Sequence, residues 1–280
     1  MEAYSHMKRI ISAIILIPAA LLVVIYAPEW IYICGVGLIG SLCLYEYCGL
    51  VRNMGIKIQA WFVIPVFLIL FGVSTCFMHA PYRSAFATAA LIAALLAIFL
   101  AAVWRPRLSM RDRALVLMAE TLGVFYFALF LYPVAAARFQ FGNKQGLYWT
   151  ILALAVIWAN DIAALAVGRK FGRTLFAPQL SPKKTNEGAA GGLVAGILVA
   201  VILQRFLITN VPLVHVIAVS VLLSVFGQLG DIAESLLKRA AGVKDSSRLI
   251  PGHGGALDRM DSLLFAFPIM YIYLLFLYKN

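Results

Sequence analysis

Charged residues are scarce in this sequence. They make up 12% of its 280 residues, against roughly 25% in soluble globular proteins. Apolar residues make up 63%, well above the roughly 45–50% of a soluble domain. A soluble domain needs polar side chains to cover its surface, so this composition excludes an ordinary soluble protein.

Cysteine is scarce too, and no two cysteines form a CxxC pair. The four are Cys34, Cys43, Cys48 and Cys76. We interpret them as small apolar packing residues, and we expect neither a disulfide nor a zinc site. The sequence also lacks internal repeats, low-complexity tracts and a soluble domain.

Long apolar runs are what the sequence has instead. Stretches of roughly 20 apolar residues predict membrane-spanning helices, so we expect an all-α, polytopic integral membrane protein with about nine transmembrane helices. The predicted spans are 10–27, 30–49, 60–78, 85–104, 114–136, 147–168, 189–209, 212–237 and 262–278. We expect that the first span is not a cleaved signal peptide and that residues 1–6, before Met7, are an added leader.

The basic residues fall mainly on one side of the predicted spans. Of the 23 Lys and Arg, the opposite side holds only Arg83, Arg138, Lys144, Arg205 and Lys279. The positive-inside rule therefore places the N-terminus in the cytoplasm of an inner or plasma membrane protein and the C-terminus outside. This distribution explains the net charge of +11 without a nucleic-acid partner, and it favours contact with anionic membrane lipid.

Intramembrane polar residues divide the chain into two predicted parts. Residues 1–145 contain few, with Glu46 and Glu120 as exceptions. For these two we expect a structural salt bridge or snorkelling to the interface. Residues 146–280 hold two polar clusters, both on the predicted cytoplasmic side. We therefore expect an N-terminal scaffold, which would carry the contacts of a homodimer, and a C-terminal catalytic part.

The first cluster lies between residues 158 and 192. Asn160 and Asp161 lie within a span, and Ser181-Pro-Lys183-Lys184-Thr185 precedes Glu187 and a glycine-rich helix start. A helix N-terminus binds phosphate through its free N–H groups, and lysines add positive charge. The alternatives are helix-packing hydrogen bonds for Asp161 and an ordinary positive loop for the lysines, and spacing alone does not decide between them.

The second cluster places carboxylates on two helix faces. Asp231, Ser235 and Lys238 are spaced i, i+4 and i+7, and Asp258 and Asp261 are spaced i and i+3. Carboxylates arranged in this way can hold a hard divalent cation through oxygen ligands. A dense charged run between two apolar spans is a hypothesis for a functional site.

A His-Gly-Gly turn lies between those two helix faces. Gly254 and Gly255 permit a tight turn, and their N–H groups can face an anion. His253 either hydrogen-bonds a phosphate, orients a neighbour, or only forms the turn.

These residues closely resemble the signature of the phosphatidate cytidylyltransferases, the CDP-diacylglycerol synthases. The resemblance covers the whole chain, and its most specific part runs from residue 235 to residue 261. Ala256 and Asn186 depart from the family pattern, and we expect changed packing there without loss of activity. The matching positions are Ser235, Lys238, Arg239, Lys244, Asp245, Pro251, His253, Gly254, Gly255, Asp258, Arg259 and Asp261.

The resemblance implies a reaction in which phosphatidate attacks the α-phosphorus of CTP and pyrophosphate leaves. It implies Mg²⁺, bound by Asp231, Asp258 and Asp261, and allows a second cation such as K⁺. The cations of the second cluster would neutralise phosphate charge and Ser235 would orient a phosphate, with Asp245 and His253 counted in the catalytic set. On the substrate-binding side the implied residues are Asn160, Asp161, Lys183, Lys184, Thr185, Glu187, Gly254 and Gly255.

Two other functions stay open at this stage. A CTP-dependent lipid kinase for a polyprenol or phytol would transfer the γ-phosphoryl group instead, giving CDP and a phospholipid. A membrane transporter would have discontinuous helices and pseudo-repeats, and the sequence shows neither. The Asp-Gly-x-x-Ala-Arg element of the CDP-alcohol phosphotransferases is absent.

Overall fold

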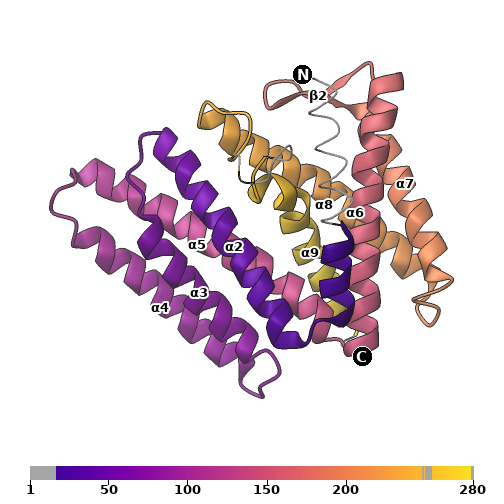
Figure 1. Ribbon diagram of the computed structural model, residues 1–280, viewed down its shortest axis with the longest axis horizontal. Coiled ribbons are helices and arrows are strands. Elements are labelled where there is room, and N and C mark those ends of the chain that lie inside the picture. The colour runs from indigo at the N-terminus through magenta and orange to yellow at the C-terminus, as the bar shows by residue number, and fades with distance from the viewer. Residues whose placement is uncertain (1–16, 248, 250–253, 279–280) are drawn as a thin grey trace. The chain divides into compact units, whose positions relative to one another are not determined.

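The structure is a computed structural model, and it describes residues 17–247, 249 and 254–278 (Figure 1). The predicted leader, the start of the first span and His253 lie outside the described residues. The described chain is mostly helical, and seven of its helices are long and apolar enough to cross a membrane. The prediction of a helical multi-pass membrane protein is confirmed, while the number of nine spans and the side of the N-terminus stay predictions.

The helices match the predicted spans closely. Two of them are shorter than the rest within the described residues: Ile17–Tyr26 and α3, which has 17 residues. The long helices are α2 (Glu29–Asn53), α4 (Arg83–Val103), α5 (Met110–Phe139), α6 (Asn143–Phe171), α7 (Asn186–Gln204), α8 (Leu213–Ala240) and α9 (Leu257–Leu277), and α3 runs over Ala60–Cys76.

One element differs from the all-α expectation. Strands β1 (Leu175–Ala177) and β2 (Ser181–Thr185) form an antiparallel hairpin with an irregularity in its register. The predicted Ser-Pro-Lys-Lys-Thr loop is therefore a strand. Strands of three and five residues are too short for a period-2 pattern to show in the sequence, and pairing with a neighbour decides their conformation.

The chain forms two compact units that interleave along the sequence. Unit 1 contains Ala27–Ala136 and Leu237–Arg259, and unit 2 contains Ala137–Leu236 and Met260–Asn280 together with Ala20–Tyr26. Both α8 and α9 therefore contribute residues to each unit. The predicted division into a scaffold and a catalytic part at residue 145 concerns function, and it stays a prediction.

In unit 1, helices α2, α3 and α4 run side by side (Figure 1). A Cβ atom on Gly40 would lie 2.6 Å from the ring of Phe67, so the missing side chain allows α2 and α3 to pack closely. The Tyr47 hydroxyl donates to the Ala119 carbonyl at 3.0 Å and links α2 to α5. Such small-residue contacts and interhelical hydrogen bonds are typical of membrane helix packing.

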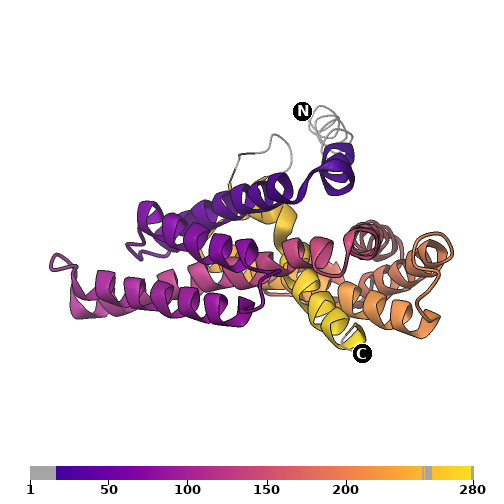
Figure 2. The same ribbon diagram turned by 90° about the horizontal axis from the view of Figure 1, so that it is seen from below.

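In unit 2, α7 lies against α6 along most of its length (Figures 1 and 2). The glycine-rich start of α7 makes this contact possible. A Cβ atom on Gly188 would lie 2.7 Å from the Ala164 carbonyl oxygen, and one on Gly192 would lie 2.6 Å from Asn160 Oδ1. These glycines therefore serve helix packing, as in other small-residue interfaces within membranes.

Glycine also ends α8 and allows the chain to turn back toward α9. Gly242 has φ +70°, its N–H donates to the Arg239 carbonyl, and the Val243 N–H donates to the Lys238 carbonyl. This pairing is a Schellman motif, in which a left-handed residue satisfies the last carbonyls of a helix. The segment between Gly242 and α9 contains Lys244, Asp245 and the Gly254-Gly255 turn, whereas the other residues of the second cluster lie on α8 and α9.

Candidate active site

Glu46 is the centre of a buried polar network in unit 1. Its side chain comes from α2, and the residue is 4% exposed. Oε1 accepts from Ser247 Oγ at 2.6 Å and from the Ala256 N–H at 3.0 Å. Oε2 accepts from Ser246 Oγ at 2.9 Å and from the Leu257 N–H at 2.8 Å. One carboxylate thus joins Ser246 and Ser247 to the start of α9.

Asp258 is the second carboxylate of this network. Its Oδ1 accepts from Lys238 Nζ at 2.7 Å in an ion pair whose side chains are 11% and 7% exposed. Its Oδ2 accepts from the N–H groups of Ser246 and Gly255, at 2.9 and 2.8 Å. The Ser246 hydroxyl lies 2.8 Å from the same oxygen. Because a hydroxyl has one proton, Ser246 can serve Asp258 or Glu46, but not both at once.

The predicted anion-binding turn is therefore occupied by the protein's own carboxylates. The N–H groups of Gly255, Ala256 and Leu257 face Asp258 and Glu46. The start of a helix favours negative charge in this way. Gly254 has φ +80°, as the tight-turn prediction requires. A Cβ atom on Gly255 would collide with Ser246 Oγ and with Glu46 Oε2.

In unit 2 the hairpin is joined to α8 by an ion pair. Lys184 Nζ lies 2.5 Å from Asp231 Oδ2, and the two side chains are 29% and 31% exposed. Both residues are among the predicted site residues, and they come from the two separate sequence clusters. The structure thus brings the clusters together at this point, with one cation and one carboxylate that solvent can reach.

A hydrogen-bond network lies deeper in the same unit. Gln228 Nε2 donates to Asn160 Oδ1 at 2.8 Å and to the Ala189 carbonyl at 3.1 Å. Asn160 Nδ2 donates to Asp161 Oδ1 at 3.3 Å. Asn160 is 1% exposed, so its side chain ties α6 to α8 and α7. For Asn160 the contacts favour the helix-packing interpretation over substrate binding, whereas Asp161 is exposed.

The N-terminus of α7 is capped by its own residues. Thr185 Oγ1 accepts from the Gly188 N–H at 3.1 Å. The Glu187 carboxylate accepts from the N–H groups of Arg173 and Thr174 and from the Thr174 hydroxyl. These contacts fix the hairpin to the helix. One N–H group of the predicted phosphate-binding helix start, that of Gly188, is therefore used inside the protein.

The remaining predicted residues differ in exposure. Ser235 is buried, with 7% of its surface exposed, and Asp261 is half-buried. The others lie at the surface, where they can meet a charged ligand: Lys183, Arg239, Lys244, Asp245 and Arg259.

The predicted Mg²⁺ ligands lie in both units. Asp258 belongs to unit 1, and Asp231 and Asp261 belong to unit 2. Within unit 2, α8 and α9 touch where a Cβ atom on Gly230 would collide with the Asp261 carbonyl. Asp231 is the next residue along α8, and carboxylates are hard oxygen donors. No group of three such side chains is formed among the described residues, and the shared-metal hypothesis stays untested.

The sequence does not reveal the roles of Glu46 and Gln228 in these networks. For Glu46 the sequence predicts a salt bridge or snorkelling, whereas its partners in the described chain are hydroxyls and backbone N–H groups. Glu120 does form the expected salt bridge, 2.9 Å from Arg105. Gln228 lies three residues before Asp231, and this helical spacing within an apolar span was the signal that could have identified it.

The helices and these polar networks define a multi-pass membrane protein with charged side chains grouped at helix ends. A profile of the cytidylyltransferase family matches residues 7–277, and the chain belongs to that family.

Curated relatives carry a more specific name. The chain is 45% identical over 132 residues to a phosphatidate cytidylyltransferase of Bacillus subtilis, covering 47% of this chain and 49% of the relative. It is 42% identical over 133 residues to the Staphylococcus saprophyticus protein of that name, covering 48% and 51%. The chain thus spans about half the length of the curated relatives in these matches.

Proposed function

We propose that this protein is a phosphatidate cytidylyltransferase. It transfers the CMP group of CTP to phosphatidate, giving CDP-diacylglycerol and pyrophosphate. The observation that carries the proposal is the family match over residues 7–277, which includes every residue assigned to the site. The relatives' shared name supports the same substrates. The match favours neither the lipid kinase nor the transporter.

The reaction requires no protein nucleophile. A phosphate oxygen of phosphatidate forms a bond to the α-phosphorus of CTP, and the bond between that phosphorus and the bridging oxygen to the β-phosphorus breaks. The reacting groups are anions, so the protein contributes positions and positive charge. Lys184 and Lys238 are well suited to this role, since each is held by a carboxylate partner.

The Lys184–Asp231 ion pair supports a specific way of binding the nucleotide. Without a ligand, the two charges neutralise each other at a site that solvent reaches. When CTP binds, the Lys184 ammonium moves to a phosphate oxygen, and the Asp231 carboxylate is released for a cation. This exchange avoids leaving either charge unpaired beside the membrane, which is costly.

Mg²⁺ is the proposed metal, with Asp231, Asp258 and Asp261 as its ligands. These residues would hold the ion, which would supply positive charge to the phosphates and to the leaving pyrophosphate. Asp231 and Asp261 fit this role by their chemistry and by the contact of their helices. Asp258 would keep Lys238 as a partner while offering an oxygen to the ion. A second cation such as K⁺ belongs to the same proposal.

Finer points of location and assembly are also proposals. The distribution of Lys and Arg supports a cytoplasmic N-terminus and an active site that faces the cytoplasm, where CTP is found. The membrane supplies phosphatidate from the side, between helices. A homodimer with contacts through residues 1–145 is part of the same proposal.

Incubation of the purified protein with labelled CTP, phosphatidate and Mg²⁺ tests the function. We expect label in a lipid when it is in the cytidine or the α-phosphate, together with release of pyrophosphate. Transfer of label only from the γ-phosphate, with release of CDP, would identify the lipid kinase instead. Absence of both products with a folded protein would refute the family-based assignment of activity.

A further inference from the structure

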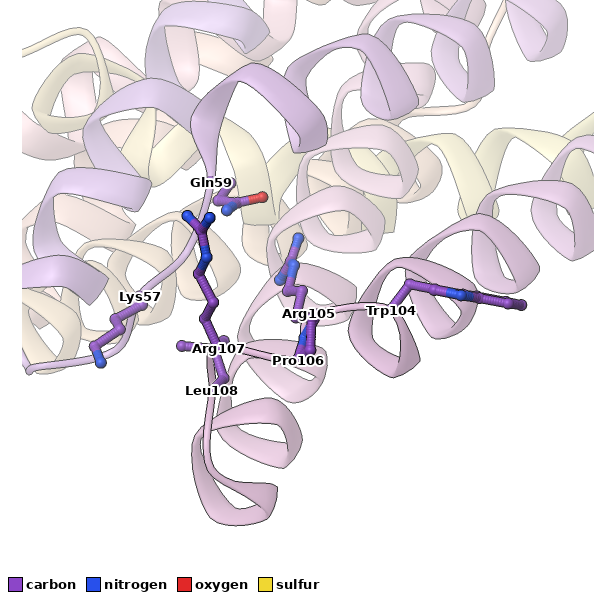
Figure 3. Close-up of a pocket in the computed structure, with 7 residues that line it drawn as sticks. All are labelled: Lys57, Gln59, Trp104, Arg105, Pro106, Arg107 and Leu108. Carbon is purple, nitrogen blue, oxygen red and sulfur yellow. The ribbon is translucent and has the colours of Figure 1, made fainter.

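A pocket in unit 1 is lined by residues that the proposed reaction does not use. It lies between the loop that precedes α3 and the loop that joins α4 to α5 (Figure 3), and its volume is about 320 Å³. Ligand pockets begin at about this size. Its lining residues are Lys57, Gln59, Trp104, Arg105, Pro106, Arg107 and Leu108.

Two charged side chains hold the walls of the pocket in place. Glu120 Oε1 accepts from Arg105 Nη2 at 2.9 Å and from the Gln59 N–H at 3.4 Å, which connects the two loops. Arg113 donates to the Leu108 and Val103 carbonyls at 3.1 and 3.2 Å. The loop between α4 and α5 is thus fixed at both ends, and the pocket is a built feature.

The pocket has an excess of positive charge. It contains three cations, and Glu120 pairs with one of them, Arg105. Arg105 Nη1 and Glu120 Oε2 are both buried without a hydrogen-bond partner among the described residues, so this ion pair has one unused donor and one unused acceptor. Lys57 and Arg107 are exposed, and Figure 3 shows the Arg107 guanidinium extending toward Gln59. The charges of the exposed Lys57 and Arg107 side chains are therefore the ones that favour an anionic ligand.

The pocket also lies at the ends of apolar helices. Helix α3 begins at Ala60 and α4 ends at Val103. Trp104 lines the pocket and Trp61 lies in the first turn of α3, and their side chains are 75% and 74% exposed. Tryptophan gathers where headgroups meet the hydrocarbon core. We propose that this pocket binds the phosphate group of an anionic phospholipid, with Lys57, Arg105 and Arg107 as the recognition residues.

Native mass spectrometry of the full chain in detergent tests this proposal. The probes are dilauroyl phosphatidylglycerol, dilauroyl phosphatidylcholine and inorganic phosphate. The variant Lys57→Gln/Arg107→Gln removes two pocket cations and keeps the Arg105–Glu120 pair. The matched control, Arg52→Gln/Arg111→Gln, removes two exposed cations that do not line the pocket. Because neither pair belongs to the proposed catalytic set, activity serves as a test of folding.

We expect the wild-type chain to retain phosphatidylglycerol in preference to phosphatidylcholine. The pocket variant should lose retention by about tenfold, since each basic residue near an anionic surface contributes measurably to binding, and the control should keep it. Equal retention of the two lipids, or equal loss in both variants, would overturn the proposal. Binding of inorganic phosphate that depends on Lys57 and Arg107, without lipid retention, would identify a soluble phosphate ligand and overturn the lipid assignment.

Discussion

At the scale of single residues, Glu46 has the most consequential environment. It is a carboxylate on a membrane helix, and four donors surround it. Carboxylate oxygens accept hydrogen bonds, so this side chain suits a site that offers hydroxyl and backbone N–H donors. The segment that carries the predicted His-Gly-Gly turn therefore depends on a residue from the opposite end of the chain.

Replacing Glu46 with Gln should destabilise the protein by about 2 kcal/mol, because the amide NH₂ group would face backbone donors. Thermal unfolding in detergent measures the loss, and CMP transfer per folded molecule should fall as well. The matched control is Glu29→Gln, since Glu29 pairs with His79 at the surface, where the side chains are 40% and 53% exposed. That change should cost less than about 1 kcal/mol. Equal losses in the two variants would contradict this description of Glu46.

The Lys238–Asp258 pair predicts strong coupling in a double-mutant cycle. Lys238→Gln and Asp258→Asn should each destabilise by about 3–5 kcal/mol, since each breaks a buried ion pair. The double variant should cost less than the sum by about 1–3 kcal/mol. Unfolding measurements on the four proteins give the coupling. Additive losses would mean that the interaction between Lys238 and Asp258 contributes little to the free energy of unfolding.

The three aspartates predict a shared effect on activity. Asp231→Asn, Asp258→Asn and Asp261→Asn should each lower turnover by about 10²–10³ if they hold one Mg²⁺. Turnover measured across a Mg²⁺ titration should show that each variant needs a higher Mg²⁺ concentration than the wild-type chain to reach its maximal activity. Near-normal turnover in any two variants at saturating Mg²⁺ would refute the shared metal site.

At the scale of elements, the hairpin distinguishes two neighbouring lysines. Lys184 pairs with Asp231, whereas Lys183 is exposed. Lys184→Gln should raise the KM for CTP about tenfold, and by more than the KM for phosphatidate, because a charge-assisted contact to phosphate is lost. Lys183→Gln is the control and should change KM by less than about threefold. If both changes reduce only the amount of inserted protein, the hairpin serves topology alone.

The close contact between α6 and α7 predicts that adding one methyl group to α7 destabilises the protein. Gly192→Ala would place a Cβ atom 2.6 Å from Asn160 Oδ1, and overpacking of this kind costs about 1–3 kcal/mol. Gly35→Ala is the matched control, because no described atom lies within 4 Å of its Cβ position. Alanine is also preferred to glycine within helices. Thermal unfolding should show a loss for the first variant and no loss for the second.

At the scale of the whole molecule, the distribution of basic residues predicts topology. Single cysteines at exposed positions 111 and 183, in a variant without the four native cysteines, should react with a membrane-impermeant reagent only from the cytoplasmic side. A cysteine at exposed position 143 should react only from the other side. Labelling of positions 111 and 183 from opposite sides would contradict the predicted topology and the cytoplasmic active site.

The sequence by itself determined where the helices lie and which kinds of charged and polar side chains the candidate site contains. Apolar runs of about 20 residues form helices in lipid because each helix satisfies its own backbone hydrogen bonds, so the helix positions follow from local composition. The spacing of Asp231, Lys238, Asp258 and Gly254 likewise located the polar clusters and the family.

Only the tertiary structure decided which partners these residues have. The Glu46 contacts span 200 to 211 positions of the chain, and the hairpin exists because residues 175–177 pair with residues 181–185. Gly188 and Gly192, in the glycine-rich start of α7, allow α7 to approach α6. Such pairings depend on how separate helices pack, and no local pattern of residues encodes that packing.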